Sequence, residues 1–319
     1  MEKGEGNNQT LITEFILLGF GNDQQYRILL FLLFLVIYIV TVAGNILIIV
    51  LVATDQHLHT PMYFFLGNLS CLETFYISTI LPRMLASFLS EDKTISVRGC
   101  IAQFYIFDCL AAVECYLLAV MSYDRYLAIC KPLLYPMLMN TRVCRWLAAG
   151  SWIGGVLLAS TIMYFTAQLT FCGSNVIDHF FCDLTPILER SCSDTSVITL
   201  VSSVVSFFVE ISPFLLTMTS YICIIVAILR IPSTSGRKKA FSTCSSHLVV
   251  VTVFYGTLTF VYLSPKNSSV GDLNKMFSVF YTVLTPLVNP LIYSLRNREV
   301  KEALRKAVSK LCPSQRDTG

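Results

Sequence analysis

The stretch that decides the fold is Glu114–Cys130, which reads ECYLLAVMSYDRYLAIC. It is an apolar helical run that begins with a carboxylate and ends in Asp124-Arg125, before Pro132 breaks the pattern. Eleven residues separate Glu114 from Arg125, about three turns and roughly 16 Å of helix rise, so both side chains lie on nearly the same face. The pattern predicts a helix that holds one charge deep in an apolar run and another at its end.

The composition around this stretch is that of a membrane protein. Hydrophobic residues make up 55% of the chain and charged residues 13%, whereas an average soluble domain has about 25% charged residues. Seven apolar runs are long enough to cross a bilayer core of about 30 Å, which needs about 20 residues. They lie near 28–52, 61–83, 100–124, 146–166, 197–229, 240–263 and 274–295. The sequence therefore predicts an all-α membrane protein, a seven-transmembrane helix bundle.

The flanking segments predict an orientation. We divide the chain into an N-terminal segment 1–25, a transmembrane domain 26–295 and a tail 296–319. With the N-terminus outside, most of the 23 Lys and Arg residues face the cytoplasm, as the positive-inside rule requires. The net charge of +3 is then a signal of topology and does not favour nucleic-acid binding. In the tail, cations alternate with Val300 and Leu304, which predicts a short amphipathic helix on the anionic inner leaflet.

Cysteines and glycosylation signals fall on the predicted outer side. The outer cysteines are Cys100, Cys172, Cys182 and Cys192. Disulfides persist in that compartment, and four cysteines allow three pairings. Asn8, in Asn-Gln-Thr, and Asn267, in Asn-Ser-Ser, are glycosylation acceptors.

Acidic side chains interrupt the apolar runs at Glu73, Asp108, Glu114 and Glu210. A carboxylate at such depth costs several kcal/mol unless it is paired, hydrated or protonated. Glu73 and Glu114 are predicted at similar depth, close enough in a bundle to share a proton or a cation. Two interpretations stay open for them: protonated acids in a structural polar network, or a cation or proton site that biases a switch.

The outer halves of the spans offer a candidate cavity. Below Asp108, small side chains follow at helical spacing and either leave room for a ligand or permit close helix packing. Glu210, in the outer half of the fifth span, is a second candidate. The sixth span carries a stripe, Phe254, Tyr255, Leu258, Thr259 and Tyr262, which is core or cavity lining. His247, near the inner end of that span, is a packing histidine or a pH reporter.

Prolines and amides predict local irregularity. Pro213 is expected to kink the fifth span. Pro286 and Pro290 interrupt the seventh, where Asn289 can satisfy freed backbone groups. Asn45 in the first span needs a partner on a neighbouring helix.

These motifs together resemble a rhodopsin-like G-protein-coupled receptor, and more narrowly an olfactory receptor of the large tetrapod class. The stretches that carry the resemblance are LHTPMYFFLGNLSCLE (58–73), MSYDRYLAIC (121–130), SY (220–221), KAFSTCSSHL (239–248) and PLVNPLIYSLRN (286–297). They occur in this order across nearly the whole chain. Cysteines 172, 182 and 192, spaced by ten, are similar to the long second extracellular loop of that family.

The resemblance implies roles for the matching residues. Cys100 would bond Cys182, and Cys172 would bond Cys192. Residues of the switch that faces the G protein would be Asp124, Arg125, Tyr126, Tyr221, His247, Asn289 and Tyr293. Glu73 and Glu114 match acids that form an internal sodium site, and no other cofactor is implied.

The resemblance also implies an odorant pocket. Its residues would be Phe107, Asp108, Ala111, Ala112, Cys115, Val205, Ser206, Val209, Tyr255, Leu258, Thr259, Tyr262, Ser278 and Thr282. Asp108 and Glu210 depart from the family pattern, and two acids above an apolar pocket suggest a ligand with a hydrogen-bond donor or an amine.

The expected function is therefore odorant reception. A small volatile ligand would activate a stimulatory olfactory-type heterotrimeric G protein and raise cAMP, at the plasma membrane of sensory cilia. A transporter or channel is disfavoured by the odd span count and by the lack of repeated halves. The motif at 239–248 argues against a peptide or amine receptor. No nucleophile with its base and no metal-ligand cluster favours an enzyme.

Overall fold

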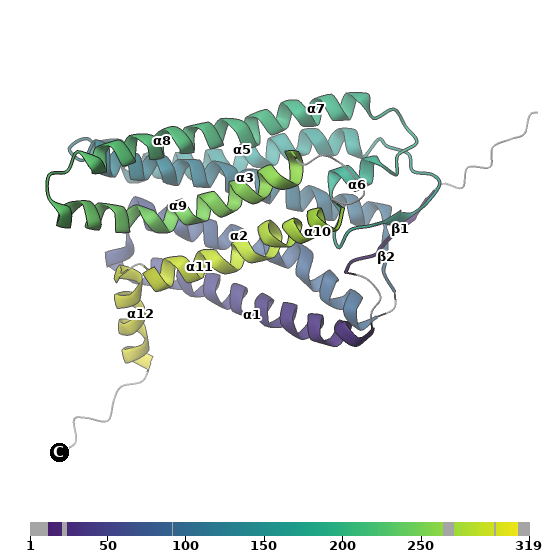
Figure 1. Ribbon diagram of the computed structural model, residues 1–319, viewed down its shortest axis with the longest axis horizontal. Coiled ribbons are helices and arrows are strands. Elements are labelled where there is room, and N and C mark those ends of the chain that lie inside the picture. Colours follow the sequence, from purple (N-terminus) through teal and green to yellow (C-terminus); the bar gives the residue numbers. More distant parts are fainter. Residues whose placement is uncertain (1–11, 21–23, 91, 264–270, 297, 312–319) are drawn as a thin grey trace, which may run out of the picture.

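Long helices that run side by side make up most of the molecule (Figure 1). The computed structural model describes residues 12–20, 24–90, 92–263, 271–296 and 298–311. Its elements are β1 (Glu14–Leu17), α1 (Gln24–Thr54), η1 (Gln56–Leu58), α2 (Pro61–Leu89), β2 (Thr94–Ser96), α3 (Val97–Cys130), α4 (Tyr135–Leu138), α5 (Thr141–Thr166), β3 (Val176–Ile177), α6 (Leu184–Leu188), α7 (Ser196–Ser206), η2 (Phe207–Ile211), α8 (Ser212–Leu229), α9 (Thr234–Leu263), α10 (Gly271–Val279), η4 (Phe280–Leu284), α11 (Thr285–Arg296) and α12 (Arg298–Leu311).

Helix lengths and composition confirm the membrane bundle. Among the residues that the structure describes, six segments are long and apolar enough to cross a membrane: Tyr26–Thr54, Pro61–Leu89, Val97–Cys130, Thr141–Thr166, Ser196–Leu229 and Lys275–Ile292. Within the described residues, α9 adds the shorter apolar stretch His247–Leu258. With α9 counted, the helices correspond to the seven predicted runs.

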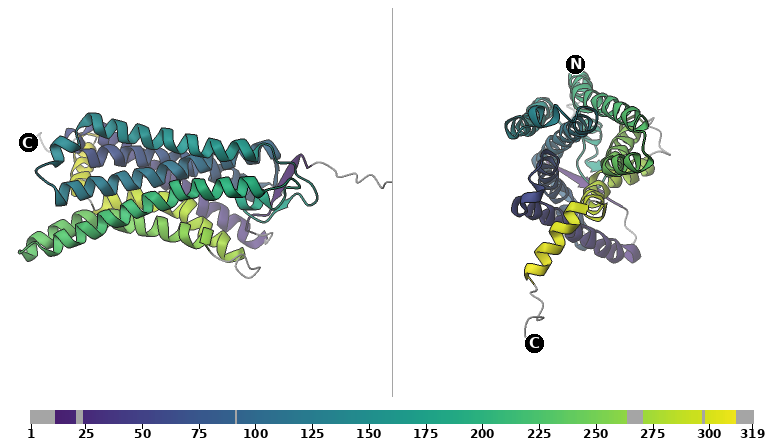
Figure 2. Two further views of the ribbon diagram at one scale, coloured as in Figure 1. Left: turned by 90° about the horizontal axis from the view of Figure 1, so that it is seen from above. Right: turned by 90° about the vertical axis from the view of Figure 1, so that its left-hand side faces the viewer.

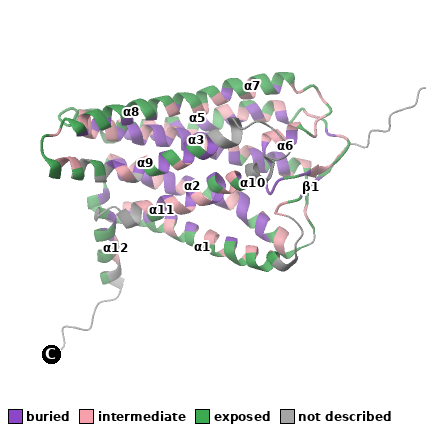
Figure 3. Cartoon of the chain, in the orientation of Figure 1, coloured by how far each residue is buried: buried purple, intermediate pink, exposed green. Residues whose placement is uncertain are grey.

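Helix α3 is the central helix of the bundle. Of its most apolar window 67% is buried, against 22% for α1, and the buried faces of α2 and α3 lie inward in Figure 3. Ser96 begins α3 because its hydroxyl accepts a hydrogen bond from the Gly99 N–H at 3.1 Å. Helix α5 approaches it closely at Gly155, where an added Cβ would lie 2.6 Å from Val113 Cγ2. A side chain at Gly155 would therefore push α5 away from the central helix.

Two spans contain a π turn in place of a simple proline kink. In η2 the Ser212 N–H bonds the Phe207 carbonyl, and in η4 the Thr285 N–H bonds the Phe280 carbonyl. The Tyr116 hydroxyl also donates to the Phe208 carbonyl at 3.1 Å. The irregularity predicted from Pro213 thus lies in the turn before the proline. A π turn leaves a backbone carbonyl without its usual partner in the helix, and a neighbouring helix can supply a donor to it.

A small sheet covers one end of the bundle. Its strand order is β2-β1-β3, with β1 antiparallel to β2 and parallel to β3. Ile16 pairs with Thr94 on one side and Val176 on the other. The sequence does not predict this sheet, because a four-residue strand has too little pattern to be distinguished from a loop.

At the opposite end, α12 turns away from the bundle axis (Figures 1 and 2). The Tyr63 hydroxyl donates to Glu299 Oε2 at 2.7 Å, and Lys306 Nζ lies 3.8 Å from Asp55 Oδ2. Val300 and Ala303 are buried while Lys301 and Arg305 are exposed. The amphipathic C-terminal helix is confirmed.

Candidate functional site

The loop 167–195, between α5 and α7, forms a lid over the end of the bundle where α3 begins. A disulfide joins Cys100 of α3 to Cys182, with their Cα atoms 5.4 Å apart. The Gln103 side chain extends this connection, since its Oε1 accepts from the Cys182 N–H at 3.1 Å and its Nε2 donates to the Thr79 carbonyl at 3.1 Å. The loop is therefore fixed to α3 and, through Gln103, to α2.

A second disulfide, Cys172–Cys192, closes the same loop on itself, with Cα atoms 5.9 Å apart. The Cys192 N–H bonds the Thr170 carbonyl at 2.9 Å, and Phe171 forms a bridge with Ser191. Both pairings are those that the resemblance implied.

Aromatic rings lie directly below the lid. Phe107 is buried, with ring centroids 5.0 Å from Phe181 of the loop, 5.2 Å from Tyr76 of α2 and 6.1 Å from Tyr281 of η4. Four segments thus meet on one ring of α3. Offset and edge contacts of this kind contribute about 0.5–1.5 kcal/mol per pair beyond buried area.

The histidine of the loop packs in the same layer. The His179 ring lies 4.8 Å from Phe180 and 4.6 Å from Phe181. Burial lowers the pKa of His179 to about 4, so the ring is neutral at physiological pH. Asp178, beside it, forms an ion pair with Lys275 of α10, which attaches the loop to the far side of the bundle.

Three acids from three segments interact electrostatically beside this aromatic layer. Asp108 of α3 is half-buried, and the carboxylates that interact electrostatically with it are those of Asp183 and Glu210. Asp183 begins α6 by accepting from the Leu184 N–H at 2.8 Å. Within the described residues, neither Asp108 nor Glu210 has a hydrogen bond or a cation partner. The site is therefore strongly acidic.

The other residues predicted for the pocket lie on the helices around these acids. Buried ones are Phe107, Ala112, Cys115, Val205, Tyr255, Leu258, Ser278 and Thr282, and half-buried ones are Asp108, Ala111, Ser206 and Val209. The Tyr255 hydroxyl donates to the Cys115 carbonyl at 3.3 Å, which joins α9 to α3. Thr282 donates to the Ser278 carbonyl at 2.6 Å within one helical segment. The side chains of Thr259 and Tyr262 lie outside the described residues.

Below the pocket, two carboxylates are completely buried at mid-bundle. Glu73 and Glu114 are both 0% exposed and interact electrostatically. Asn289 donates its side-chain N–H to Glu73 Oε1. In the part of the chain that the structure describes, Glu73 Oε2 and both Glu114 oxygens have no hydrogen-bond partner.

These unsatisfied oxygens fit a proton or a small cation. Oxygen ligands suit a hard cation, and protonation would also remove the charge. Among the described residues, no group of three or more His, Cys, Asp or Glu side chains could hold a metal ion. A cation here would therefore be held by the two carboxylates with neutral oxygens, as in a sodium site.

Two amides lie at this depth, and one of them has a different role from the one predicted. Asn289 was expected to satisfy freed backbone groups of its own helix, but its amide donates to Glu73. Asn45 of α1 has the predicted partner on a neighbouring helix, since it donates to the Pro286 carbonyl of α11 at 3.3 Å. That carbonyl is the backbone group left by Pro290, which has no N–H to donate four residues later.

At the far end of α3, every buried charge has a partner. Asp124 is 0% exposed and accepts from Arg125 Nε at 3.0 Å and Nη2 at 2.5 Å. The Tyr135 hydroxyl donates to its other oxygen at 2.8 Å. The Arg125 side chain is only 12% exposed, so this arrangement hides the guanidinium.

A second polar contact closes the same end. The Tyr221 hydroxyl and His247 Nδ1 are 2.5 Å apart, and both residues are buried. This contact supports the packing interpretation of His247. Tyr126 packs on the cluster of Tyr221, Ile224 and Cys244. The Tyr293 side chain lies outside the described residues, as do Asn8 and Asn267.

Sequence reasoning missed Tyr76, Phe181, Asp183 and Tyr281, although all four lie in or beside the candidate pocket. A signal existed for two of them. Phe181 and Asp183 flank Cys182, and any loop residue bonded to the first turn of α3 must bring its neighbours over the bundle. Tyr76 and Tyr281 gave no signal, because an aromatic residue in an apolar span is usually core.

Comparisons with known proteins agree with this geometry. Residues 34–311 match the model of a family described as olfactory receptor. The chain is 52% identical to olfactory receptor 9G4 of Homo sapiens, over 97% of the chain and 94% of that protein. It is 50% identical to olfactory receptor 6B1 of Homo sapiens, over 95% and 96%, and 50% identical to olfactory receptor 5P68 of Mus musculus, over 95% and 96%.

Among solved structures, the chain resembles squid rhodopsin with a TM-score of 0.71, over 91% of this chain and 87% of that one. The sequence identity is 16%, so this likeness concerns the fold.

Proposed function

We propose, from the premise that the chain belongs to the olfactory receptor family, that it binds small volatile ligands in the outer half of its helix bundle. It is a multi-pass membrane receptor with the rhodopsin-like seven-helix fold, and not an enzyme. The proposed output is activation of a stimulatory olfactory-type heterotrimeric G protein, which raises cAMP.

The proposed ligand site is inferred mainly from one observation. The half-buried acids Asp108 and Glu210 lie beside apolar residues of α3, α7 and α9. Ligand pockets are mostly apolar with a few placed polar groups. The lid above is held by the Cys100–Cys182 disulfide. A small apolar molecule with one polar group suits such a surrounding.

The charge of this site favours ligands that donate hydrogen bonds. Asp108, Asp183 and Glu210 repel one another, and a bound amine or hydroxyl would relieve that repulsion. We therefore propose that aliphatic amines and alcohols rank above ketones and esters of equal size. A hydrogen bond to a charged group contributes about 1.5–3 kcal/mol.

The proposed response is a shift between two arrangements of the bundle. A ligand changes this equilibrium only by its difference in affinity for the two arrangements. The structure has Arg125 paired and hidden, which suits the inactive one. In the active one, the inner end opens and Arg125, with Asp124 and Tyr126, faces the G protein, while Tyr221, His247, Asn289 and Tyr293 rearrange.

Glu73 and Glu114 are proposed as the internal link between the two ends. A sodium ion or a proton at their unsatisfied oxygens would stabilise the inactive arrangement. Reorientation of Asn289, which donates to Glu73, would then connect this site to α11.

The proposed topology has segment 1–25 outside, the spans within 26–295 and segment 296–319 in the cytoplasm. Asn8 would be glycosylated, and Asn267 is a second acceptor. The receptor would act in the plasma membrane of sensory cilia.

The test is a chemically diverse odorant panel, applied to cells that express the full chain and a cAMP reporter. We expect saturable responses, with amines and alcohols ahead of matched ketones. Cells expressing the chain at the surface but responding to no compound, with a related olfactory receptor responding in parallel, would contradict the proposed function.

A further inference from the structure

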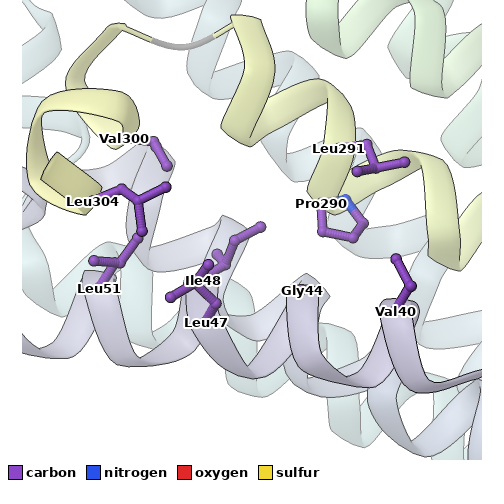
Figure 4. A pocket seen from close by; sticks show the side chains of 9 residues that line it. All are labelled: Val40, Gly44, Leu47, Ile48, Leu51, Pro290, Leu291, Val300 and Leu304. Carbon is purple, nitrogen blue, oxygen red and sulfur yellow. The ribbon is translucent and has the colours of Figure 1, made fainter. Parts of the chain in front are cut away.

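An apolar groove lies on the outside of the bundle between α1, α11 and α12 (Figure 4). Its volume is about 170 Å³. The rim residues Val40, Leu47 and Leu291 are 42%, 38% and 39% exposed, and the floor residues Ile48, Leu51 and Val300 are 2%, 3% and 2% exposed. The concavity is therefore open toward the outside of the bundle.

Gly44 and Pro290 shape the middle of this groove. An added Cβ on Gly44 would lie 3.3 Å from Pro290 Cβ, so α1 and α11 approach closely there. Figure 4 shows Gly44 facing the proline ring, with Leu47 and Ile48 one turn further along α1. The Asn45 bond to the Pro286 carbonyl keeps the two helices together beside it. The groove is a fixed feature of helix packing.

One end of the groove is covered by α12, which carries exposed cations. Val300 and Leu304 line the groove, and the next residues along the helix, Lys301 and Arg305, are exposed. The acids of α12, Glu299 and Glu302, are exposed as well. The Tyr63–Glu299 hydrogen bond and the Lys306–Asp55 contact hold α12 in place. A fixed basic edge therefore borders an apolar groove.

We propose that this groove binds one acyl chain of an anionic phospholipid of the cytoplasmic leaflet, with its headgroup on Lys301 and Arg305. The inference rests on the proposed topology, in which α12 lies at the cytoplasmic surface. A groove on the lipid-facing surface is lined by apolar side chains, so a hydrocarbon chain fills it without loss of hydrogen bonds. The cations select the headgroup because Lys and Arg side chains are attracted to anionic lipid headgroups.

The test is photolabelling of the purified full chain in phosphatidylcholine nanodiscs. The two probes are phosphatidylserine and phosphatidylcholine, each with a diazirine in the acyl chain, and labelled peptides are identified by mass spectrometry. We expect phosphatidylserine to label peptides of α1 and α12 severalfold more than phosphatidylcholine does.

Two pairs of variants test the two halves of the site. Val40→Phe with Leu47→Phe fills the groove and should remove most labelling, whereas Ile46→Phe, which is exposed but outside the groove, should not. Lys301→Gln with Arg305→Gln should abolish the preference for phosphatidylserine. The matched control is Arg142→Gln with Arg145→Gln, which changes two exposed cations elsewhere.

Equal labelling of the groove-filled and Ile46→Phe variants would overturn the proposal, as would equal labelling by the two probes in the parent chain. The measurement needs no odorant and no G protein. A receptor silent in the cAMP assay but labelled as described would therefore contradict the proposed function and leave the lipid site standing.

Discussion

The two ends of α3 differ in whether their buried acidic side chains have partners. At its C-terminal end, Asp124 is fully buried and accepts hydrogen bonds from Arg125 and Tyr135. Ten residues earlier, about 15 Å along the axis, Glu114 is equally buried, and neither of its oxygens has a partner among the described residues. Asp108, nearer the N-terminal end of α3, also has no cation partner among the described residues.

This difference indicates which parts of the helix are complete without other molecules. A buried carboxylate is stable when it is hydrogen-bonded to a cation, and costly when it is not. At the C-terminal end of α3, the chain itself supplies the hydrogen-bond partners of the buried carboxylate, which suits a contact that holds one arrangement of the bundle. The middle and outer parts require a proton, an ion or a ligand, which suits binding sites. Variants at each part of α3 test this difference.

The largest effect is expected from Arg125→Ala, which removes the partner of Asp124. We expect cAMP production to fall to the level of cells without receptor, because the guanidinium is the proposed contact of the G protein. Surface level should be measured by flow cytometry, and Arg142→Ala, at an exposed cation, is the control. A normal cAMP response would show that Arg125 has no role in coupling.

The next effect concerns the outer end of α3, where Cys100 holds the lid. Cys100→Ser and Cys182→Ser should reduce surface expression alike, since loss of a native disulfide typically costs about 2–5 kcal/mol. Cys172→Ser should cost less, because its bridge spans 20 residues and the other spans 82. Cys223→Ser, at an exposed free cysteine, is the control. If only one member of the first pair failed, the pairing would be refuted.

A smaller effect is expected at Glu114. Replacing sodium by choline in the medium should shift the odorant EC50 of the parent receptor severalfold, and Glu114→Gln should remove that shift because it has no charge to hold the ion. Asp108→Asn, on the same helix, should keep it. A parent receptor indifferent to sodium would favour protonated acids instead.

The most restricted effect is expected from Asp108→Ala, which should change the preference for one class of ligand without silencing the receptor. Loss of a charged hydrogen bond of about 1.5–3 kcal/mol should raise the EC50 for amines about tenfold or more, while EC50 values for ketones stay unchanged. The control is Ile106→Ala, at an exposed position of the same helix. An unchanged order of ligands at equal surface expression would exclude Asp108 from ligand choice.

The fold was largely predictable because apolar runs of membrane length have few alternative structures. The π turns η2 and η4 were not predictable, since they depend on whether a neighbour such as Tyr116 can satisfy the freed carbonyl. Nor was the donation from Asn45 to the Pro286 carbonyl, which requires the positions of both α1 and α11.

The candidate site also has one part that the sequence predicts and one part that it does not. Asp124-Arg125 is a local pair, so sequence alone suggested it. Contacts between Phe107 and Phe181 or Tyr281 join distant segments, and the rotamers and helix tilts that create them are not encoded in any short motif. The identity of a ligand depends on those contacts.

The three-stranded sheet has a consequence for biosynthesis. Strand β1 is translated first, but the Asn175 side chain that bonds the Glu14 carbonyl lies 161 residues later. At about 5–20 residues per second, ribosomes need roughly 10–30 s to supply it. During that interval β1 has no β3 to pair with, so the sheet is completed only after the first four long helices, α1, α2, α3 and α5, have been synthesised.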